Sequence, residues 1–527
     1  MTACVNRRIC IVALTVLLAT PAAAQDVAGL DAVFVRWSGD RPGCSLGIER
    51  AGAPPVTRSW GLAELEHRIP ATPSTVYEAG SVSKQFTAAA ILLLADDGRL
   101  SLDDDVRRWL PELPDYGRTI TIRHMLNHTS GLRDWGSVVA LEGWPRGSRA
   151  MEQSQVLEVV ARQGALNFEP GSEWLYSNSG YNLAAIIVAR ISGQSFADFT
   201  RERLFGPLGM THTGWRDDYT AIVPGRAAAY TPATGGYRLA MPFENAHGNG
   251  GLLTTVGDLL TWNRALTEGR LNLAERLAQP GVVAGRSTHY GFGLERNVHD
   301  GQAEIAHGGA TGGYRTWLAR YPDQRLSIAL LCNTADANPE MLGRQVADLF
   351  LPESPETPPY VPTGPAPEGL FAGTRTGEPF GLRMTVRGPV VIPSGQPLTP
   401  VGPDVWRLGT NELRFEGRDR FARITEDGDS IIYERRQPVA PDAGALAAYA
   451  GTYVSDEARA RWTLRVIEGR LALDQGGQPP VIIAPTYLDV FATPGFVLRF
   501  DRNPAGEVTV MHVNAGRARD VVFNRIP

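Results

Sequence analysis

The chain has 527 residues, more than one hydrophobic core usually supports, so two to four domains are expected. Hydrophobic residues make up 43% and charged residues 20%, a globular composition that excludes a disordered chain or a coiled coil. The formal net charge is -5, and we therefore expect no nucleic acid among the partners.

The first 24 residues have the pattern of a secretory signal peptide. Arg7 and Arg8 precede an apolar run over residues 9–18, and three consecutive alanines end at Ala24. The run is about half as long as a membrane-spanning helix. We therefore expect cleavage after Ala24, no membrane span, and a periplasmic or secreted protein.

The segment that follows mixes helical and strand patterns. A strand is predicted over 44–49, and a helix over 81–97, where apolar residues recur at helical spacing. A second helix is predicted over 182–191. Two strands joined by a Pro-Asp-Gln turn are predicted over 314–321 and 326–333. These elements predict an α/β/α sandwich whose sheet uses the first strand and the last three, with a helical lobe inserted between them.

The tail after Leu370 repeats itself. Phe371-Ala-Gly-Thr returns as Tyr449-Ala-Gly-Thr, and Leu413-Arg-Phe returns as Leu498-Arg-Phe. Such a repeat indicates two copies of one β unit, although chance similarity between β-rich segments is an alternative. Each copy is short enough to need closure into a small barrel to hide its edge strands.

These patterns divide the chain into a series of domains. After the signal peptide we predict one α/β domain, a linker in which prolines remove backbone donors, and two small antiparallel, lipocalin-like β-barrels. Their predicted bounds are 25–352, 353–369, 370–437 and 440–527.

Gly80-Ser-Val-Ser-Lys84 opens the helix predicted over 81–97. Residues three apart share a helical face, so Ser81 and Lys84 point the same way. A serine hydroxyl becomes a nucleophile when a neighbouring base takes its proton, and lysine is such a base when its neutral form is favoured. The helix N-terminus also offers a backbone N–H to an oxyanion. Taken alone, the pattern is more simply explained by an N-capping serine.

Two further motifs carry groups suited to the same chemistry. Tyr176-Ser-Asn178 lies in a predicted loop, where the phenol can shuttle a proton and the amide can bind a substrate carbonyl. A structural turn is the alternative. His307-Gly308-Gly309-Ala310 enters a predicted strand, and its missing side chains let a substrate backbone approach closely. The Ala310 N–H would complete an oxyanion hole with that of Ser81. The alternative is a glycine-rich bend with an incidental histidine.

In this order, at spacings of about 95 and 130 residues, the three motifs resemble the serine β-lactamase and penicillin-binding-protein superfamily. The similarity covers roughly residues 27–350, and it is closest to the class C branch with its peptidase and esterase relatives, the S12-like peptidases. The resemblance implies these roles: Ser81 as nucleophile, Lys84 and Tyr176 as proton-transfer partners, His307 as a further catalytic group, Ser81 and Ala310 as oxyanion donors, and Asn178, Gly308 and Gly309 as substrate contacts.

One departure from that superfamily bears on the substrate. β-Lactamases and D,D-carboxypeptidases usually carry Lys-Thr-Gly or Lys-Ser-Gly where this chain has His307-Gly308-Gly309. This chain therefore lacks the lysine ammonium and the hydroxyl that help to hold a substrate carboxylate in those enzymes. Their loss argues against efficient penicillin hydrolysis. His-x-Gly and the doubled tail are similar to D-aminopeptidases, in which a loop from the last barrel reaches the catalytic cleft. The candidate loop here is 474–478.

The resemblance therefore implies a serine hydrolase that forms an acyl-enzyme on Ser81, a D-aminopeptidase or D-stereospecific peptidase. A family VIII-like carboxylesterase, a weak β-lactamase, and a non-catalytic penicillin-binding or peptidoglycan sensor are the alternatives. The expected partner is a small molecule or short peptide containing a D-amino acid. We expect no cofactor and no metal. A homodimer is left open, because the sequence does not determine the oligomeric state.

Several other residues imitate functional motifs. Gly43-Cys-Ser45-Leu-Gly47 matches a nucleophile elbow, but a strand pattern follows the serine where a helix is required. His124 and His128 have metal-ligand spacing without a suitable carboxylate, so a helix end is favoured. Ser130 has no adjacent base and is expected in a turn.

Only two cysteines, Cys44 and Cys332, remain after signal cleavage, too few for a disulfide framework or a zinc cluster. In the superfamily that the chain resembles, the strands that would carry them are antiparallel neighbours. They are therefore expected either to form a disulfide or to be two buried free thiols.

Overall fold

A computed structural model describes residues 27–144, 147–352, 360–361, 368–385, 388–425, 430–476 and 479–527. The predicted signal peptide and most of the predicted linker lie outside the described residues.

The first part of the chain is built on a six-stranded antiparallel sheet with the order β12-β13-β14-β15-β1-β2. The predicted first strand and terminal hairpin are confirmed as neighbours at its centre. The bounds are β1 (Cys44–Arg50), β2 (Val56–Trp60), β12 (Glu295–His299), β13 (Gln302–Thr311), β14 (Tyr314–Tyr321) and β15 (Leu326–Cys332).

Helices cover both faces of this sheet, so the α/β/α sandwich is confirmed. On one face α1 (Val27–Phe34) and α11 (Pro339–Asp348) pack together, and α11 lies against β14 and β15. On the other face α9 (Val256–Thr267) packs on β1 and β15. Covering both faces buries most of the central strands: every residue of β15 is buried, and all of them except Ser327 are apolar.

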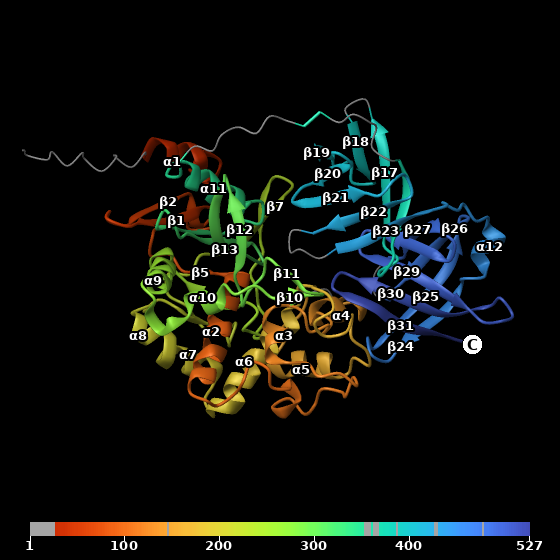
Figure 1. Ribbon diagram of the computed structural model, residues 1–527, viewed down its shortest axis with the longest axis horizontal. Helices are drawn as coiled ribbons and strands as arrows, with labels where there is room; N and C mark the ends of the chain where they lie inside the picture. Colours follow the sequence, from red (N-terminus) through yellow and green to blue (C-terminus); the bar gives the residue numbers. More distant parts are fainter. Residues whose placement is uncertain are drawn as a thin grey trace, which may run out of the picture.

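The helical lobe is inserted between β2 and β12 (Figure 1). Its central helix, α2 (Ser83–Asp96), follows the 3-10 turn η2 (Gly80–Val82), and both were predicted as one helix over 81–97. It packs on α6 (Asn178–Ser192), which begins four residues before the predicted start at Asn182. Both helices are buried along most of their length, and this packing fixes the position of the first turn of α2.

The remaining elements of this part are short. The helices are α3 (Ile122–Leu126), α4 (Trp135–Leu141), α5 (Gln153–Ala161), α7 (Phe196–Thr200), α8 (Gly206–Leu208) and α10 (Ala274–Leu277). The strands are β3 (Leu62–Glu64), β4 (Ile69–Pro70), β5 (Tyr77–Glu78), β6 (Gly214–Trp215), β7 (Tyr230–Ala233), β8 (Gly236–Leu239), β9 (Leu252–Thr254), β10 (Val282–Val283) and β11 (Arg286–Ser287).

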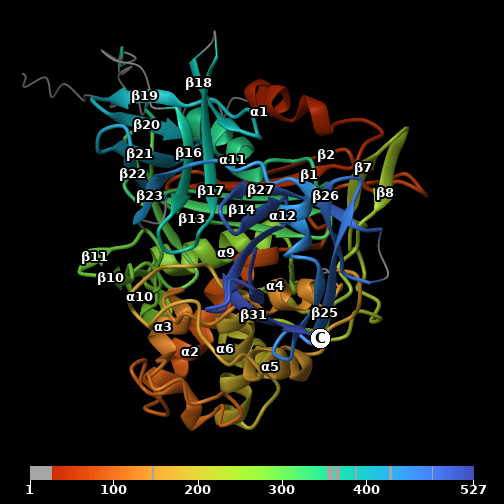
Figure 2. The same cartoon turned by 90° about the vertical axis from the view of Figure 1, so that its right-hand side faces the viewer.

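The tail forms two units of eight antiparallel strands, which lie along one side of the first part (Figures 1 and 2). The first unit consists of β16 (Gly369–Gly373), β17 (Pro379–Thr385), β18 (Gly388–Ile392), β19 (Thr399–Gly402), β20 (Val405–Leu408), β21 (Asn411–Phe415), β22 (Arg420–Ile424) and β23 (Ser430–Arg436). The second, after helix α12 (Ala443–Ala447), consists of β24 (Gly451–Ser455), β25 (Ala460–Ile467), β26 (Arg470–Asp474), β27 (Val481–Tyr487), β28 (Val490–Thr493), β29 (Phe496–Arg502), β30 (Val508–Ala515) and β31 (Ala518–Ile526).

The two units differ in closure. The second is a closed barrel, because β24 pairs with β31. In the first, the sheet starts at β18 and ends at β19, and these two strands do not pair. An isolated bridge joins Val390 of β18 to Pro397, two residues before β19.

The predicted repeat is confirmed by strand register. Trp406 pairs with Leu413 in the first unit, and their counterparts Phe491 and Leu498 pair in the second. A register shift follows Pro400 in β19 and its counterpart in β27. The two units are therefore copies of one β design.

The second barrel shares its hydrophobic core with the helical lobe. One continuous cluster of buried side chains runs from α2 and α4 into the interior of the barrel. At the junction Trp462 of β25 donates its indole N–H to the carbonyl of Leu141 at 3.0 Å. The core of the first β unit is a separate cluster. The second barrel is thus the one that is built into the first part of the chain.

Cys44 and Cys332 form a disulfide between β1 and β15. They are Cα partners in the antiparallel register, and both are fully buried. Of the two expectations for these cysteines, the disulfide is therefore confirmed.

Candidate active site

Ser81 and Lys84 meet at the start of α2. Ser81 lies in the η2 turn, and Nζ of Lys84 donates to its Oγ at 3.1 Å. The side chain of Lys84 is fully buried, whereas that of Ser81 is partly exposed. The spacing of three residues thus places an amine beside a hydroxyl that solvent can reach.

Two asparagines hold the lysine in position. Nζ of Lys84 also donates to Oδ1 of Asn178 at 2.9 Å and to the backbone carbonyl of Asn249 at 2.7 Å. Asn178 is itself fixed by Asp134, whose Oδ2 accepts its backbone N–H at 2.8 Å and its side-chain N–H at 2.9 Å. The amide of Asn178 lines the cleft, but its oxygen is already used by Lys84.

Tyr176 lies in the loop before α6, with its ring centre 4.8 Å from Nζ of Lys84. Burial raises the pKa of its phenol; a hydrogen bond with Ser81 and the charge of Arg517 oppose this shift. The phenol therefore keeps its proton in the resting site and is next to the serine hydroxyl. The structure thus brings Ser81, Lys84, Tyr176 and Asn178 together, as the motifs predict.

The strand β13 passes directly over the η2 turn. A Cβ on Gly80 would lie 2.7 Å from the backbone nitrogen of Ala310, and one on Gly309 would collide with the carbonyl oxygen of Ala79. Thr316 of β14 donates to that same carbonyl at 2.8 Å. The glycines thus let the two backbones approach until the residues beside Ser81 and the N–H of Ala310 are neighbours, as an oxyanion hole requires.

His307 is buried on β13 among aromatic rings. Its Nε2 lies 2.9 Å from the hydroxyl of Tyr290, and its Nδ1 lies 2.6 Å from the carbonyl of Gly308. Burial and the charge of Lys84 lower the pKa of His307 to about 3, so the imidazole is neutral at physiological pH. Its ring centre is 6.3 Å from that of Tyr176. The structure places it beside Tyr176 rather than against Ser81, and a catalytic role stays a prediction.

A cleft of about 440 Å³ opens above Ser81. Its lining consists of Ser81, Tyr176, Asn178, Gly308, Gly309, Ala310, Arg315, Asn338, Pro339, Glu340 and Arg517. A second hollow of about 440 Å³ continues past Tyr176 between Trp174, Trp317 and Arg517. The predicted substrate contacts Gly308 and Gly309 are both in the cleft wall.

The sequence motifs missed three members of this site. The carbonyl of Asn249 accepts from Lys84, but no local pattern marks it as a lysine partner. Tyr290, the partner of His307, lies in a loop. Arg517 belongs to the turn between β30 and β31 of the second barrel. Residues that reach a site from a distant part of the chain leave no spacing signal.

The barrel loop predicted to reach the cleft was 474–478. In its described part, 474–476, Asp474 accepts from the backbone N–H of Gly476 and lies 3.8 Å from Arg465, and none of these three residues lines the cleft. Residues 477–478 lie outside the described residues. A turn of the last barrel does reach the cleft, but it is the one that carries Arg517.

The residues that only imitate motifs have structural roles. Ser45 is buried on β1, within hydrogen-bonding distance of Ser59 and Tyr77. His124 caps the start of α3, where its Nδ1 accepts the N–H of Thr121 at 3.3 Å. Ser130 is buried, and its Oγ accepts the N–H of Leu132.

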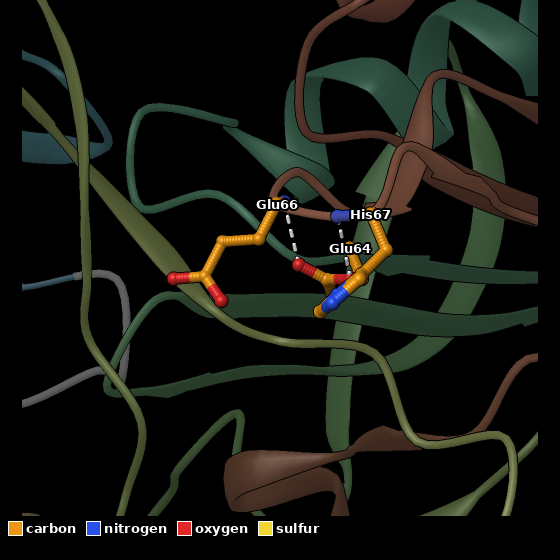
Figure 3. Close-up of side chains that lie close together, drawn as sticks. All are labelled: Glu64, Glu66 and His67. Atoms are coloured by element: carbon orange, nitrogen blue, oxygen red, sulfur yellow. Dashed lines mark hydrogen bonds and ion pairs between the residues drawn. The ribbon is translucent and has the colours of Figure 1, made fainter.

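Three side chains of the types that bind metals lie at the end of β3 and in the turn to β4. Figure 3 shows Glu64, Glu66 and His67 close together. The Glu64 carboxylate accepts the backbone N–H of Glu66 at 2.5 Å and that of His67 at 3.0 Å, and it lies 2.7 Å from the imidazole of His67. The carboxylate is thus used to close the turn.

Comparison with known proteins agrees with this geometry. The family model for beta-lactamase matches residues 23–351. A D-aminopeptidase of Gluconobacter oxydans (strain 621H) is 28% identical over 533 residues, covering 95% of this chain and 98% of that protein. Within the described residues, all helices are too short or too polar to cross a membrane.

Two solved structures share the fold. The octameric penicillin-binding protein homologue from Pyrococcus abyssi has a TM-score of 0.56 at 21% identity, covering 87% of this chain and 99% of that one. The D-amino acid amidase from Ochrobactrum anthropi SV3, complexed with L-phenylalanine amide, has a TM-score of 0.53 at 23% identity, covering 61% and 97%. The second likeness is confined to part of the chain, whereas the first extends well beyond it.

Proposed function

Because this chain belongs to the beta-lactamase family, we propose that it is a serine hydrolase that acts on amides of D-amino acids through an acyl-enzyme on Ser81. The D-aminopeptidase of Gluconobacter oxydans, to which it is similar over nearly its whole length, supports this substrate class. The observation that carries the proposal is the contact of a buried lysine amine with the accessible Ser81 hydroxyl.

In the proposed reaction, Oγ of Ser81 attacks the amide carbonyl carbon. Lys84 in its neutral form takes the serine proton, since its Nζ is 3.1 Å from Oγ. The phenol of Tyr176, which burial keeps protonated, passes a proton to the leaving nitrogen. The amine departs and leaves the acyl group on Ser81.

The same groups then serve hydrolysis of the acyl-enzyme. The backbone N–H groups of Ser81 and Ala310 stabilise the oxyanion of both tetrahedral intermediates. A water gives a proton to the Tyr176 phenolate as it attacks the acyl carbon. When this second tetrahedral intermediate collapses, Lys84 returns its proton to Oγ of Ser81, and the D-amino acid leaves. This assignment is supported by the approach of β13 to η2 that Gly80 and Gly309 allow.

A substrate panel tests the proposal. We expect hydrolysis of D-alanine p-nitroanilide with a kcat/KM at least about tenfold above that of the L-isomer, and slower turnover of nitrocefin and p-nitrophenyl acetate. The Ser81→Ala variant should lose on the order of a millionfold in kcat, as removal of the nucleophile does in a serine hydrolase.

Labelling with a fluorescent fluorophosphonate supplies the matched control. Ser130→Ala, which removes a buried hydroxyl that accepts the N–H of Leu132, should still be labelled, and Ser81→Ala should not. Full hydrolysis by Ser81→Ala contradicts the mechanism. A preference for the ester or for nitrocefin favours a carboxylesterase or a weak β-lactamase, and labelling without turnover of any substrate favours a sensor.

We also propose that the protein is exported to the periplasm or the cell exterior. The signal pattern of residues 1–24 and the disulfide between Cys44 and Cys332 support this, because disulfides persist in oxidising compartments. N-terminal sequencing of the mature protein should begin at Gln25. An intact Met1 on protein recovered from the cytoplasm contradicts export.

A further inference from the structure

We propose that Arg517, which the second barrel contributes to the cleft, binds a carboxylate of the substrate. The preferred substrates are then short peptides that keep a free carboxylate on the part released from Ser81. The inference rests on the proposed function, because it takes Ser81 as the reacting centre, and it adds the class of leaving group.

Arg517 stands between the two hollows of the site. It lines the cleft above Ser81 and also the hollow beyond Tyr176. Its guanidinium lies over the ring of Tyr176, 4.6 Å from the ring centre. A group bound by Arg517 is therefore held next to the proposed proton donor, on a substrate that reaches Ser81.

The backbone of this turn is fixed to the helical lobe. The N–H of Arg517 donates to Oγ of Ser137 at 3.0 Å. Its carbonyl accepts the N–H of Asp134 at 3.3 Å and a side-chain N–H of Asn167 at 3.0 Å. Asn167 also accepts the N–H of Arg519 at 2.7 Å. The arginine is thus presented from a rigid base, as a specificity group requires.

The guanidinium still has donors to offer. Its side chain is 44% exposed, and Oδ2 of Asp134, at 3.9 Å, is an ion-pair partner beyond hydrogen-bond distance. That oxygen already accepts two hydrogen bonds from Asn178. Among the described residues, no hydrogen bond from the Arg517 side chain is found. A planar fork of N–H groups in this state matches a carboxylate in two parallel hydrogen bonds.

The other charged groups of the cleft wall are less suited to the task. Arg315 donates to the carbonyls of Gly312 and Tyr314 at 3.0 and 2.7 Å, which turns its guanidinium toward its own backbone. Glu340 is an anion paired with Arg344. The neutral His307 supplies no positive charge from β13. Arg517 is the cation that remains for an anionic substrate group.

Two dipeptides with the same scissile bond separate recognition from chemistry. D-Alanylglycine has a free carboxylate, and D-alanylglycinamide does not, while both release D-alanine. We expect the wild-type kcat/KM for the acid to exceed that for the amide about tenfold or more, the range of a charged hydrogen bond. In Arg517→Gln this ratio should fall to about one, and Arg517→Lys should retain part of it.

The ratio of the two kcat/KM values is the readout, rather than either value alone. Arg517 also lies over Tyr176, so its loss can slow hydrolysis of both dipeptides equally. Arg470→Gln is the matched control: it removes an arginine of the same barrel that is 61% exposed and lines neither hollow, and it should keep the wild-type ratio. A wild-type ratio of one, or an equal loss on both dipeptides in Arg517→Gln, overturns the inference.

Failure of the proposed function gives a different result. It appears as no hydrolysis of D-alanine p-nitroanilide, which has no carboxylate. Calorimetry on the Ser81→Ala variant then tests the inference without turnover. Tighter binding of D-alanylglycine than of its amide, lost when Arg517→Gln is added, supports carboxylate recognition, and equal affinities overturn it.

Discussion

The charge state of His307 follows from its surroundings. The imidazole is buried among aromatic rings, with Nε2 beside the hydroxyl of Tyr290 and Nδ1 beside the carbonyl of Gly308. A carbonyl oxygen accepts only, so Nδ1 carries the proton and Nε2 accepts the Tyr290 hydroxyl. Burial and Lys84 disfavour a second proton. The neutral ring therefore fixes Tyr290 without adding a charge beside Lys84.

The lowered pKa of His307 should make the stability of the fold depend on pH. The pKa of His307 is about 3 in the folded protein and about 6.5 in the unfolded chain, so between these values the unfolded state binds the extra proton. Stability is fully present above pH 6.5 and falls as the pH is lowered toward 3. Between pH 7 and pH 5, the wild type should therefore lose about 2 kcal/mol more free energy of unfolding than His307→Gln does.

Denaturant unfolding of both proteins at pH 5, 6, 7 and 8 measures the difference. His128, whose pKa is also lowered by burial, is common to both and cancels. The exposed His289, changed to Gln, controls for loss of a histidine as such. Parallel stability profiles for wild type and His307→Gln contradict the prediction.

At the scale of elements, the site depends on how closely β13 crosses the η2 turn. Gly309 faces the carbonyl of Ala79 and the hydroxyl of Thr316, where a side chain has no room. One residue earlier, a Cβ on Gly308 would meet the ring of Trp317 at 3.5 Å, an ordinary van der Waals contact. The two neighbouring glycines therefore serve different purposes: one allows the strand to close on the turn, and the other leaves space in the cleft.

Replacing these glycines tests this contact. Gly309→Ala should lower the free energy of unfolding by about 1–3 kcal/mol, because overpacking forces β13 away from η2. Gly308→Ala is the matched variant and should lose markedly less. Thermal unfolding of the two variants gives the comparison. An equal change in Tm would mean that β13 yields without cost and that the close approach is not fixed by Gly309.

At the scale of the whole molecule, the second barrel and the helical lobe meet around Arg133. Its side chain is 1% exposed, and it pairs with Glu457 of the barrel at 2.7 Å. It also donates to the carbonyls of Arg519 and Asp520, next to the turn that bears Arg517. A buried charge on the lobe is thus neutralised by the barrel, and this arrangement sets the position of Arg517.

Removing the barrel's carboxylate should destabilise the joined unit. Glu457→Ala leaves the guanidinium of Arg133 buried without its ion-pair partner, which costs about 3–5 kcal/mol in comparable cases. Glu468→Ala removes a barrel carboxylate that is 82% exposed and 3.8 Å from Arg470, and it should stay close to the wild type. Calorimetric unfolding checks both. A Tm for Glu457→Ala equal to that of Glu468→Ala contradicts a barrel held by this pair.

The sequence by itself determined the features that depend on nearby residues. The three-residue step from Ser81 to Lys84 puts both on one helical face. Two strand-like runs around a Pro-Asp-Gln turn predict β14 and β15, and the repeated motifs predict two copies of one β unit. Family resemblance added Tyr176, Asn178 and Ala310 to the site. In each case the physical cause is local, or a whole motif carries the signal.

The tertiary structure alone decided the rest. It gave Lys84 the carbonyl of Asn249, directed His307 to Tyr290 and closed the second β unit but not the first. It also brought Arg517 to the cleft, whereas 474–476, the described part of the predicted loop, do not line it. These outcomes depend on how the barrel packs on the lobe and on which backbone atoms then face the site. Such contacts join residues far apart in the chain, so no local spacing or periodicity encodes them.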